Sequence, residues 1–241
     1  MYSEIFTGDR TDKRFYGIYR GVVIDSNDPE NKGRIRVKVP QILGNAVTGW
    51  AWEIVGGTGG ANTPYGTFSD TTDQLVTAAN TATAMKFNTT EDVNKIYIGT
   101  DTTRIYVEET GDYLFQVSPQ FAKPGSSSSF QIDFWVRKNG TDLPRTNSRV
   151  TVQGNPNEVL ACVPFILDLN AGDYVQAMFS SADAGATIQH HDGLTSPTRP
   201  NIPSVIATIS LIGKYKPQPE TGVWVMFEGG DPNFPLWLGA F

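Results

Sequence analysis

The residues best suited to chemistry are His190, His191 and Asp192, which combine metal-ligating and general-base side chains in one short stretch. Adjacent residues of a strand point to opposite faces, so the two histidines cannot easily share one metal ion. The chain has no other histidine to complete such a site. A polar loop is the favoured interpretation, and near a symmetry axis such histidines would titrate around neutral pH. We therefore predict no metal and no cofactor.

Carboxylate and serine chemistry find no better support. Asp28 and Asp231 could in principle form a glycosidase pair. Each precedes a proline, however, and Asp-Pro is first of all a turn signal. The serine run at 126–129 lacks the strand–turn–helix context of a nucleophile elbow, and no Ser/His/Asp set is recognisable by spacing. The sequence therefore predicts a protein that is not an enzyme.

The composition excludes several other classes. With 19 basic and 25 acidic residues, the formal charge is −6, which lacks the electrostatic footprint of a nucleic-acid-binding protein. A single cysteine excludes disulfide scaffolds and cysteine zinc sites. Cys162 lies in the apolar run VLACVPFIL and is predicted to be a buried small hydrophobe. No apolar run resembles a signal peptide or could span a bilayer, so we expect synthesis in a cytoplasm and no membrane insertion.

The elements that would position these residues are short strands. Residues 16–24 and 34–39 alternate between apolar and other side chains around a polar turn, which predicts a β-hairpin with Ile35, Val37 and Val39 on one face. A third strand is expected at 50–55, with Trp50 and Trp52 in a core. The glycine run Gly56–Gly60 is interpreted as a flexible connector. Two last strands are expected around 223–227 and 236–238.

The middle of the chain, from about residue 67 to 214, has a different pattern of strands and turns. About ten short strand-like runs separated by turns are typical of a sandwich or barrel. Asn139-Gly140 is a strong two-residue hairpin signal. Only residues 75–85 could form a helical turn. The fold class is therefore predicted to be all-β.

The two end segments resemble a known family. RGVVIDSNDPENKGRIRVKVP, WAWEIV and TGVWVMFEGGDPNFPLWLGAF together resemble the OB-fold domain of phage baseplate-hub and tail-spike proteins, which type VI secretion spike proteins also carry. The resemblance implies a five-stranded OB-fold barrel that is split in sequence, with segments at 16–60 and 215–241 and an N-terminal arm at 1–15. The matching features are Asp28-Pro29, Gly33-Arg34, Trp50-Ala51, Gly222–Phe227, Asp231-Pro232 and Pro235–Gly239.

The family often continues into a lysozyme domain or a β-helical needle, and the chain shows neither segment. Instead, residues 61–214 lie between strands three and four, where an insertion costs little loop entropy. This insert resembles the jelly-roll β-sandwich of complement and tumour necrosis factor type. The resemblance rests on Gly111–Phe115, Trp135–Gly140, Asn170–Val175 and the closing SVIATISLIG. Both families commonly form trimers.

These resemblances imply a structural protein of the virion: a hub- or spike-type component of a phage tail baseplate. The implied partners are further copies, as a homotrimer, and other baseplate or tail proteins. On the barrel we expect the oligomer or partner interface to use aromatic side chains, with core packing as the alternative for each. These residues are Tyr19, Trp224, Phe234 and Trp237.

Two other binding functions are weighed against this one. OB folds often bind oligonucleotides, but residues 1–56 and 215–241, which are the barrel segments counted with the N-terminal arm, carry nine basic and ten acidic residues, and phosphate binding needs a positive excess. We therefore expect Arg34, Arg36 and Lys38 to face solvent or protein, and no nucleic-acid partner. The remaining alternative is a receptor- or glycan-binding module in which the jelly roll contacts a host surface glycan. Its candidate contacts are Trp135, Tyr174, His190, His191 and Asp192.

Overall fold

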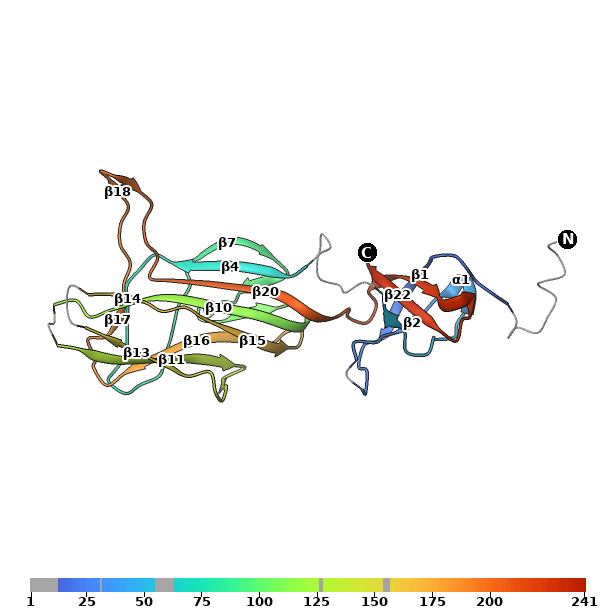
Figure 1. Ribbon diagram of the computed structural model, residues 1–241, viewed down its shortest axis with the longest axis horizontal. Coiled ribbons are helices and arrows are strands. Elements are labelled where there is room, and N and C mark those ends of the chain that lie inside the picture. Colours follow the sequence, from blue (N-terminus) through green and yellow to red (C-terminus); the bar gives the residue numbers. More distant parts are fainter. Residues whose placement is uncertain (1–12, 31, 55–62, 126–127, 154–156) are drawn as a thin grey trace. The chain divides into compact units, whose positions relative to one another are not determined.

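The computed structural model describes residues 13–241, apart from 31, 55–62, 126–127 and 154–156. Most of the predicted N-terminal arm, the glycine run Gly56–Gly60 and two of the four serines therefore lie outside the described residues. The chain divides into two compact units. The first comprises Met1–Gly60, Glu109–Gly111 and Gly213–Phe241, and the second comprises Ala61–Glu108 and Asp112–Ile212. Strands dominate both units (Figure 1), which confirms the all-β prediction.

The first unit is a five-stranded sheet with the order β2-β1-β21-β22-β3. Its neighbours are antiparallel except for β22 and β3, which are parallel. Beyond the sheet path, Ile35 and Ala51 exchange backbone hydrogen bonds of 3.2 and 2.7 Å, so the two ends of the sheet meet. This is the OB-fold topology. The elements are β1 (Tyr19–Asp25), β2 (Arg36–Lys38), α1 (Pro40–Leu43), β3 (Trp52–Glu53), β21 (Gly222–Phe227), the 3-10 helix η3 (Glu228–Gly230) and β22 (Pro235–Ala240).

The core of this sheet confirms the alternation read from the hairpin. Ile35, Val37 and Val39 are fully buried, whereas the basic residues between them face outward. On β1, Gly21 faces the core, where a Cβ atom would lie only 2.4 Å from Val37 Cγ1. A side chain at this position would force the strands apart. The nine buried residues of the core come from both ends of the chain: Val23, Ile35, Val37, Val39, Ala51, Val223, Val225, Phe227 and Trp237.

The prediction of a core position for Trp50 and Trp52 was wrong. Trp52 is 48% exposed, and Trp50 is only partly buried. Ala51, between them, takes the inward position and is fully buried. Because the strand alternates, both tryptophans point away from the core.

The second unit consists of two sheets packed as a sandwich, and of a separate two-stranded hairpin. The larger sheet has the order β5-β17-β10-β20-β4-β7, with β14 and β15 paired to β10; the smaller has the order β12-β11-β16-β9-β8, with β13 on β11 and β6 on β16. The larger sheet contains β4 (Tyr65–Asp70), β5 (Gln74–Leu75), β7 (Thr89–Asn94), β10 (Thr110–Ala122), β14 (Val159–Leu160), β15 (Val163–Leu169), β17 (Thr187–Ile188) and β20 (Val205–Lys216). The smaller contains β6 (Thr83–Ala84), β8 (Ile96–Ile98), β9 (Ile105–Val107), β11 (Phe130–Lys138), β12 (Thr141–Asp142), β13 (Ser148–Val152) and β16 (Tyr174–Ser181). The separate hairpin is β18 (Leu194–Thr195) with β19 (Thr198–Arg199).

Strict alternation along the long strands builds the sandwich core. On β10, Tyr113 and Phe115 are fully buried and their neighbours are not, and the same period continues on β11. Asn139 and Gly140 join β11 to β12 with positive φ angles of 48° and 80°. Positive φ at both central residues is the geometry of a type I′ hairpin turn, which confirms the hairpin predicted there.

The sandwich begins and ends on neighbouring strands. β4 and β20 are antiparallel, with Tyr65 opposite Ser210, and the Leu211 N–H donates to the Pro64 carbonyl at 2.9 Å. A segment whose ends lie side by side can be placed in a surface connection without pulling the flanking strands apart.

Two local predictions for this unit were wrong. Residues 75–85 form no helical turn but run between β5 and β6, where the Thr83 hydroxyl accepts a 2.9 Å hydrogen bond from the Thr77 N–H. Cys162 is exposed, because Ala161 occupies the inward position at the turn between β14 and β15. Its Sγ atom lies 3.1 Å from Gln116 Nε2 on the outer face of the larger sheet.

Candidate functional site

The outer face of the five-stranded sheet is the first candidate site. The strand register places Arg20 of β1 opposite Trp224 of β21, and Trp224 opposite Gly239 of β22. The inward partners along these strands are core residues, so this row faces outward. Ile18 (62% exposed) and Val22 (38% exposed) flank Arg20 on the same side of β1. The result is an apolar strip with a cation at its centre.

Arg20 and Trp224 form a cation–aromatic cluster with Phe241. The Arg20 Cζ atom lies 5.4 Å from the Trp224 ring centroid and 5.5 Å from that of Phe241. The two rings are 4.9 Å apart at an angle of 45°. A guanidinium over aromatic faces is held by the ring quadrupole. The cluster therefore presents a large, pre-ordered surface rather than mobile side chains.

The other three predicted interface residues lie elsewhere. Trp237 is fully buried in the core, so its prediction as an exposed interface residue is corrected: the outward positions of β22 belong to its neighbours in sequence. Tyr19 is partly buried against the core, with its ring 6.0 Å from that of Phe227. Phe234 is 58% exposed in the connection from β21 to β22. Of the four, Trp224 and Phe234 present surface, but in different places.

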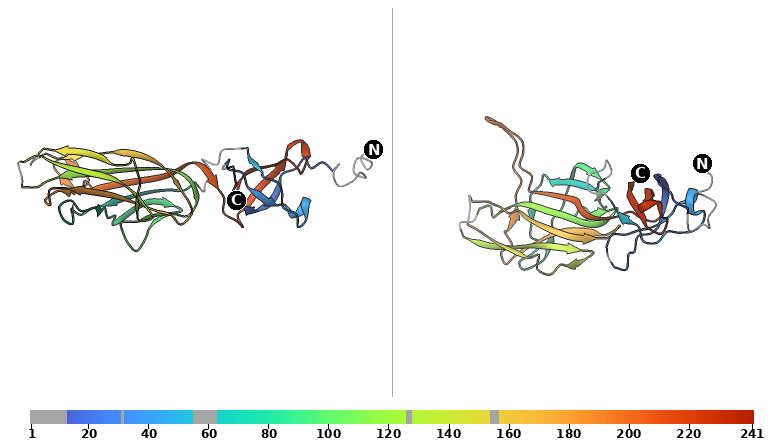
Figure 2. Two further views of the ribbon diagram at one scale, coloured as in Figure 1. Left: turned by 90° about the horizontal axis from the view of Figure 1, so that it is seen from below. Right: turned by 45° about the vertical axis from the view of Figure 1, so that its right-hand side comes forward.

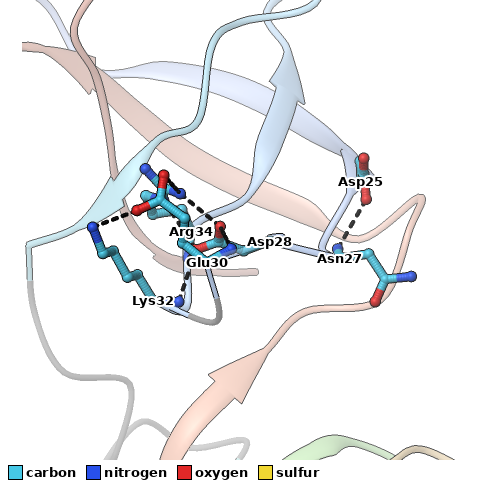
Figure 3. A network of polar contacts seen from close by, with 6 residues as sticks. All are labelled: Asp25, Asn27, Asp28, Glu30, Lys32 and Arg34. Carbon is cyan, nitrogen blue, oxygen red and sulfur yellow. Dashed lines mark hydrogen bonds and ion pairs between the residues drawn. The ribbon is translucent and has the colours of Figure 1, made fainter.

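The connection between β1 and β2 is ordered by one carboxylate (Figure 3). Asp28 accepts hydrogen bonds from the backbone N–H groups of Glu30 and Lys32 at 3.0 and 2.9 Å, and from Arg34 Nε and Nη2 at 2.9 and 2.7 Å. The Asp28 carboxylate itself is inaccessible to solvent. The bond from the Arg34 guanidinium, supported by the backbone donors, holds the pKa of Asp28 far below its ordinary value although burial opposes this.

The same arginine also contacts Trp50 and Trp52, the two tryptophans that were wrongly predicted to lie in the core. Arg34 Cζ lies 5.2 Å from the Trp52 ring centroid and 5.9 Å from that of Trp50. Its side chain is only 11% exposed, so it is neither the solvated nor the protein-facing residue expected from the alternation. Asp28 thus works as a turn residue, and its charge is neutralised locally rather than offered to a substrate.

The five predicted glycan contacts are not brought together as one site. Trp135 Nε1 donates a 2.7 Å hydrogen bond to Asp142, which fixes it on the β11–β12 hairpin. His191 Nε2 lies 2.9 Å from Glu158, and the His190 N–H donates to Asp73 at 2.8 Å. Asp192 is almost entirely exposed. Within the described residues, no group of three or more His, Cys, Asp and Glu side chains could hold a metal ion.

Tyr174 instead joins a row of tyrosines that the sequence reading missed. The register pairs Tyr174 with Tyr106 and Tyr106 with Tyr97 across β16, β9 and β8. The Tyr97 and Tyr106 rings are 5.3 Å apart and nearly parallel, and Tyr106 lies 5.2 Å from Tyr174. Arg104 Cζ stands 4.7 Å from the Tyr174 ring centroid. The signal was a tyrosine at an outward position on three strands, but the strand order that aligns them is not readable from one sequence.

A hollow of about 620 Å³ at the end of the sandwich is lined mostly by polar side chains, among them Asn80, Ser180 and the ion pair of Asp133 with Arg149. Arg149 Nε lies 2.6 Å from Asp133 Oδ1, which holds the pKa of this carboxyl below its ordinary value. A second ion pair joins Lys123 to Asp183 at the rim. These charged side chains are thus paired with one another in ion pairs, which favours a structural role for the hollow.

Comparison with protein families identifies the first segment. Residues 19–68 match the model of the type VI secretion system/phage-baseplate injector OB domain. No curated protein matches the chain. The matched segment contains β1, β2 and β3 and continues into β4 of the second unit. No helix of the described residues is long and apolar enough to cross a membrane. The resemblance of this segment to the OB domain of phage baseplates and type VI secretion spikes is therefore confirmed, and it supports a structural role in a baseplate.

Proposed function

We propose that this protein is a hub- or spike-type component of a phage tail baseplate that assembles with further copies of itself, as a trimer, and with neighbouring tail proteins. The observation that carries the proposal is the OB sheet, whose first three strands match the injector OB domain and whose last two return from the far end of the chain. The role is mechanical, without an enzymatic step. The virion tail is its location.

The outer strip of the OB sheet supports assembly through this domain. Arg20, Trp224 and Phe241 form an ordered aromatic and cationic surface next to exposed aliphatic side chains. Tryptophan and arginine are among the residue types that are enriched in the hot spots of protein interfaces, and the contacts of Arg20 with the two rings already order its side chain. We propose this strip, with Phe234 as a separate contact, as the surface that meets a partner.

The sandwich supports the same proposal. We propose that residues 61–214 are an inserted jelly roll, since the region has two packed sheets and adjacent ends on β4 and β20. The resemblance to trimeric jelly rolls then favours three copies around one axis. Such an insert would add a second layer of self-contact without interrupting the OB sheet.

Light scattering on the purified full chain tests self-assembly directly. We expect a trimer at micromolar concentration. Trp224→Ala should weaken association, or binding to a neighbouring tail protein, by about 2 kcal/mol. Tyr97→Ala, on the sandwich, is the matched control and should leave association unchanged. A monomer at every concentration would contradict the assembly proposal, and clearing of a peptidoglycan suspension would contradict the non-enzymatic role.

A second candidate function is supported by the tyrosine row. Tyr97, Tyr106 and Tyr174 form a continuous aromatic surface with Arg104 beside it, and Tyr97 is 45% exposed at the sheet edge. Aromatic rings with polar neighbours can stack on the apolar face of a sugar and bind its hydroxyls. A glycan array is the test: hits lost in Tyr97→Ala would favour the receptor role, whereas an array without hits would count against it.

A further inference from the structure

Residues 192–201 form a projecting hairpin, which we name the arm and which is distinct from the predicted N-terminal arm at 1–15. It leaves the sandwich as β18 and β19, and no other described segment of the sandwich lies alongside its tip (Figures 1 and 2). Leu194 pairs with Arg199, and Thr195 with Thr198. All ten residues are exposed except Arg199, which is partly buried.

The arm makes few polar contacts with the described residues of its own unit. Its hydrogen bonds are internal, from Thr198 Oγ1 to the Thr195 carbonyl at 3.2 Å and from Arg199 Nη1 to the Pro200 carbonyl at 3.3 Å. Among the described residues, the polar contact that leaves the arm is a 3.9 Å approach of Asp192 to His190 at its base. A two-stranded hairpin alone is at best marginally stable in water. An arm in this position would gain stability from a surface that the described residues of its own sandwich do not provide.

The base of the arm, by contrast, is firmly built. His191 and Ile202 exchange two backbone hydrogen bonds of 2.9 and 2.8 Å. The His191 ring lies 2.9 Å from Glu158, and Asp73 accepts a hydrogen bond from the His190 N–H. These contacts hold both strands where they leave the sandwich. They give the two histidines a structural role at the base.

A suitable receiving surface lies on the larger sheet of the same unit. Leu160 of β14 is 58% exposed and Ile166 of β15 is 70% exposed. β15 pairs with β10 on one side, and no described strand pairs with it on the other. An apolar strand with an open edge can accept a further strand through its backbone groups. On the same outer face, β20 adds Ile206 and Ile212, both partly exposed.

We propose that the arm of one copy docks along β14 and β15 of a neighbouring copy. The arm offers Leu194 (46% exposed), prolines and threonines, and the charges of Asp192 and Arg199 cancel. This neutral and partly apolar character fits an apolar strand edge, whereas a nucleic acid or an anionic membrane would require a positive excess. The inference rests on the proposed self-assembly and names the contact that holds the copies together.

The contact is compatible with the proposed trimer. The arm and the β14–β15 edge are different surfaces, so copies that each give the arm to the next neighbour can close into a ring, whereas reciprocal exchange between two copies would give a two-fold dimer. Five residues on each side of the arm give a reach of about 16 Å at ~3.3 Å per residue, which exceeds the ~10 Å between face-packed sheets. The arm is therefore long enough to cover a neighbour's sheet.

The first test removes the arm and keeps its base. Because His191 and Ile202 exchange backbone hydrogen bonds, an Asn-Gly turn in place of residues 192–201 can close the hairpin. By light scattering, we expect self-association of the full-length variant to weaken about tenfold or more. Tyr97→Ser, in an exposed position on the other sheet, is the control and should associate like the wild type. Unchanged association of the armless chain would overturn the inference and leave the proposed assembly standing.

The second test detects the contact itself. In a Cys162→Ser background, Leu194→Cys and Ile166→Cys in one chain should form cross-links between copies with a short bismaleimide, up to a closed ring. Leu194→Cys with Tyr97→Cys is the control and should stay uncross-linked. A wild-type oligomer that yields no specific cross-link would overturn the arm contact alone. A wild-type monomer would overturn the proposed self-assembly and the arm contact together, so the two failures are distinguishable.

Discussion

The OB sheet and the sandwich build their cores by opposite routes. The OB sheet takes β1 to β3 from one end of the chain and β21 and β22 from the other, and four of its nine core residues come from the last segment. The sandwich builds its two sheets from almost uninterrupted sequence, and its ends are paired on β4 and β20. The comparison indicates that the OB sheet depends on distant parts of the chain, whereas the sandwich can fold by itself.

Removing residues 221–241 should produce the largest effect and tests that difference directly. The deletion takes away β21, β22 and the core residues Val223, Val225, Phe227 and Trp237. We expect the region around Tyr16–Pro40 to unfold and the sandwich to remain folded. Hydrogen exchange, resolved by segment, measures both. Loss of protection in the two units together would contradict the insertion architecture.

Single core truncations should sharpen the comparison. Trp237→Ala and Phe115→Ala each empty a fully buried aromatic position, one in each unit, and each should cost about 3–5 kcal/mol. The OB core has nine residues, so we expect Trp237→Ala to unfold the OB sheet. Phe115→Ala should lower the melting temperature of the sandwich and leave it folded. Calorimetry with two resolved transitions is the measurement, and a single merged transition that shifts with either variant would show that the units are not independent.

Asp28→Ala should have the next largest effect. It removes the acceptor for the backbone N–H groups of Glu30, Lys32 and Arg34 and for the Arg34 guanidinium, and we expect a loss of about 2–3 kcal/mol from the OB sheet. Asp28→Asn should cost less, because the amide oxygen can still accept from the backbone. The matched control is Asp25→Asn in the same hairpin, where the carboxylate accepts one bond, from the Asn27 N–H at 2.8 Å (Figure 3). Equal costs at the two positions, by urea unfolding, would contradict the special role of Asp28.

The pH dependence of the OB sheet should follow from the same carboxylate. Because the pKa of Asp28 is lower in the folded state than in the unfolded chain, its contribution is fully present above the unfolded value of about 4. It is lost as the pH falls further toward the folded value. Asp28→Asn should therefore flatten the decline in OB stability below about pH 4 and leave the sandwich transition unchanged. A variant that loses stability with acid as steeply as the wild type would show that other carboxylates dominate.

The sequence predicted those features that depend on local residue patterns, and it failed to predict several that depend on packing or on strand order. Local sequence patterns were sufficient to predict alternating strands such as β1, β2 and β21, and also the Asn139-Gly140 turn. The OB resemblance then joined the two end segments of the chain across the residues between them. The errors arose where a small residue, rather than its larger neighbour in sequence, takes the inward position of a strand. Ala51 is buried beside Trp52, whose ring contacts Arg34 instead, and Ala161 is buried beside Cys162. The tyrosine row and the arm depend on strand order, which local patterns do not encode.

The smallest expected effects come from substitutions at two turn glycines. They test, with the smallest perturbation, whether the OB sheet and the sandwich unfold independently. Gly33 in the OB hairpin and Gly140 in the sandwich have φ angles of 73° and 80°, and a Cβ atom would meet no atom within 4 Å at Gly33 and only the Tyr174 hydroxyl at 3.6 Å at Gly140. The cost of alanine is therefore backbone strain alone, about 1 kcal/mol at each site. Asparagine tolerates a positive φ angle, so Gly33→Asn and Gly140→Asn are the matched controls and should cost less. In urea unfolding followed separately in each unit, Gly33→Ala should move only the OB transition and Gly140→Ala only the sandwich transition. A shift of both transitions by either variant would mean that the two units share stability, and that the sandwich is not the autonomous insert its continuous sequence indicates.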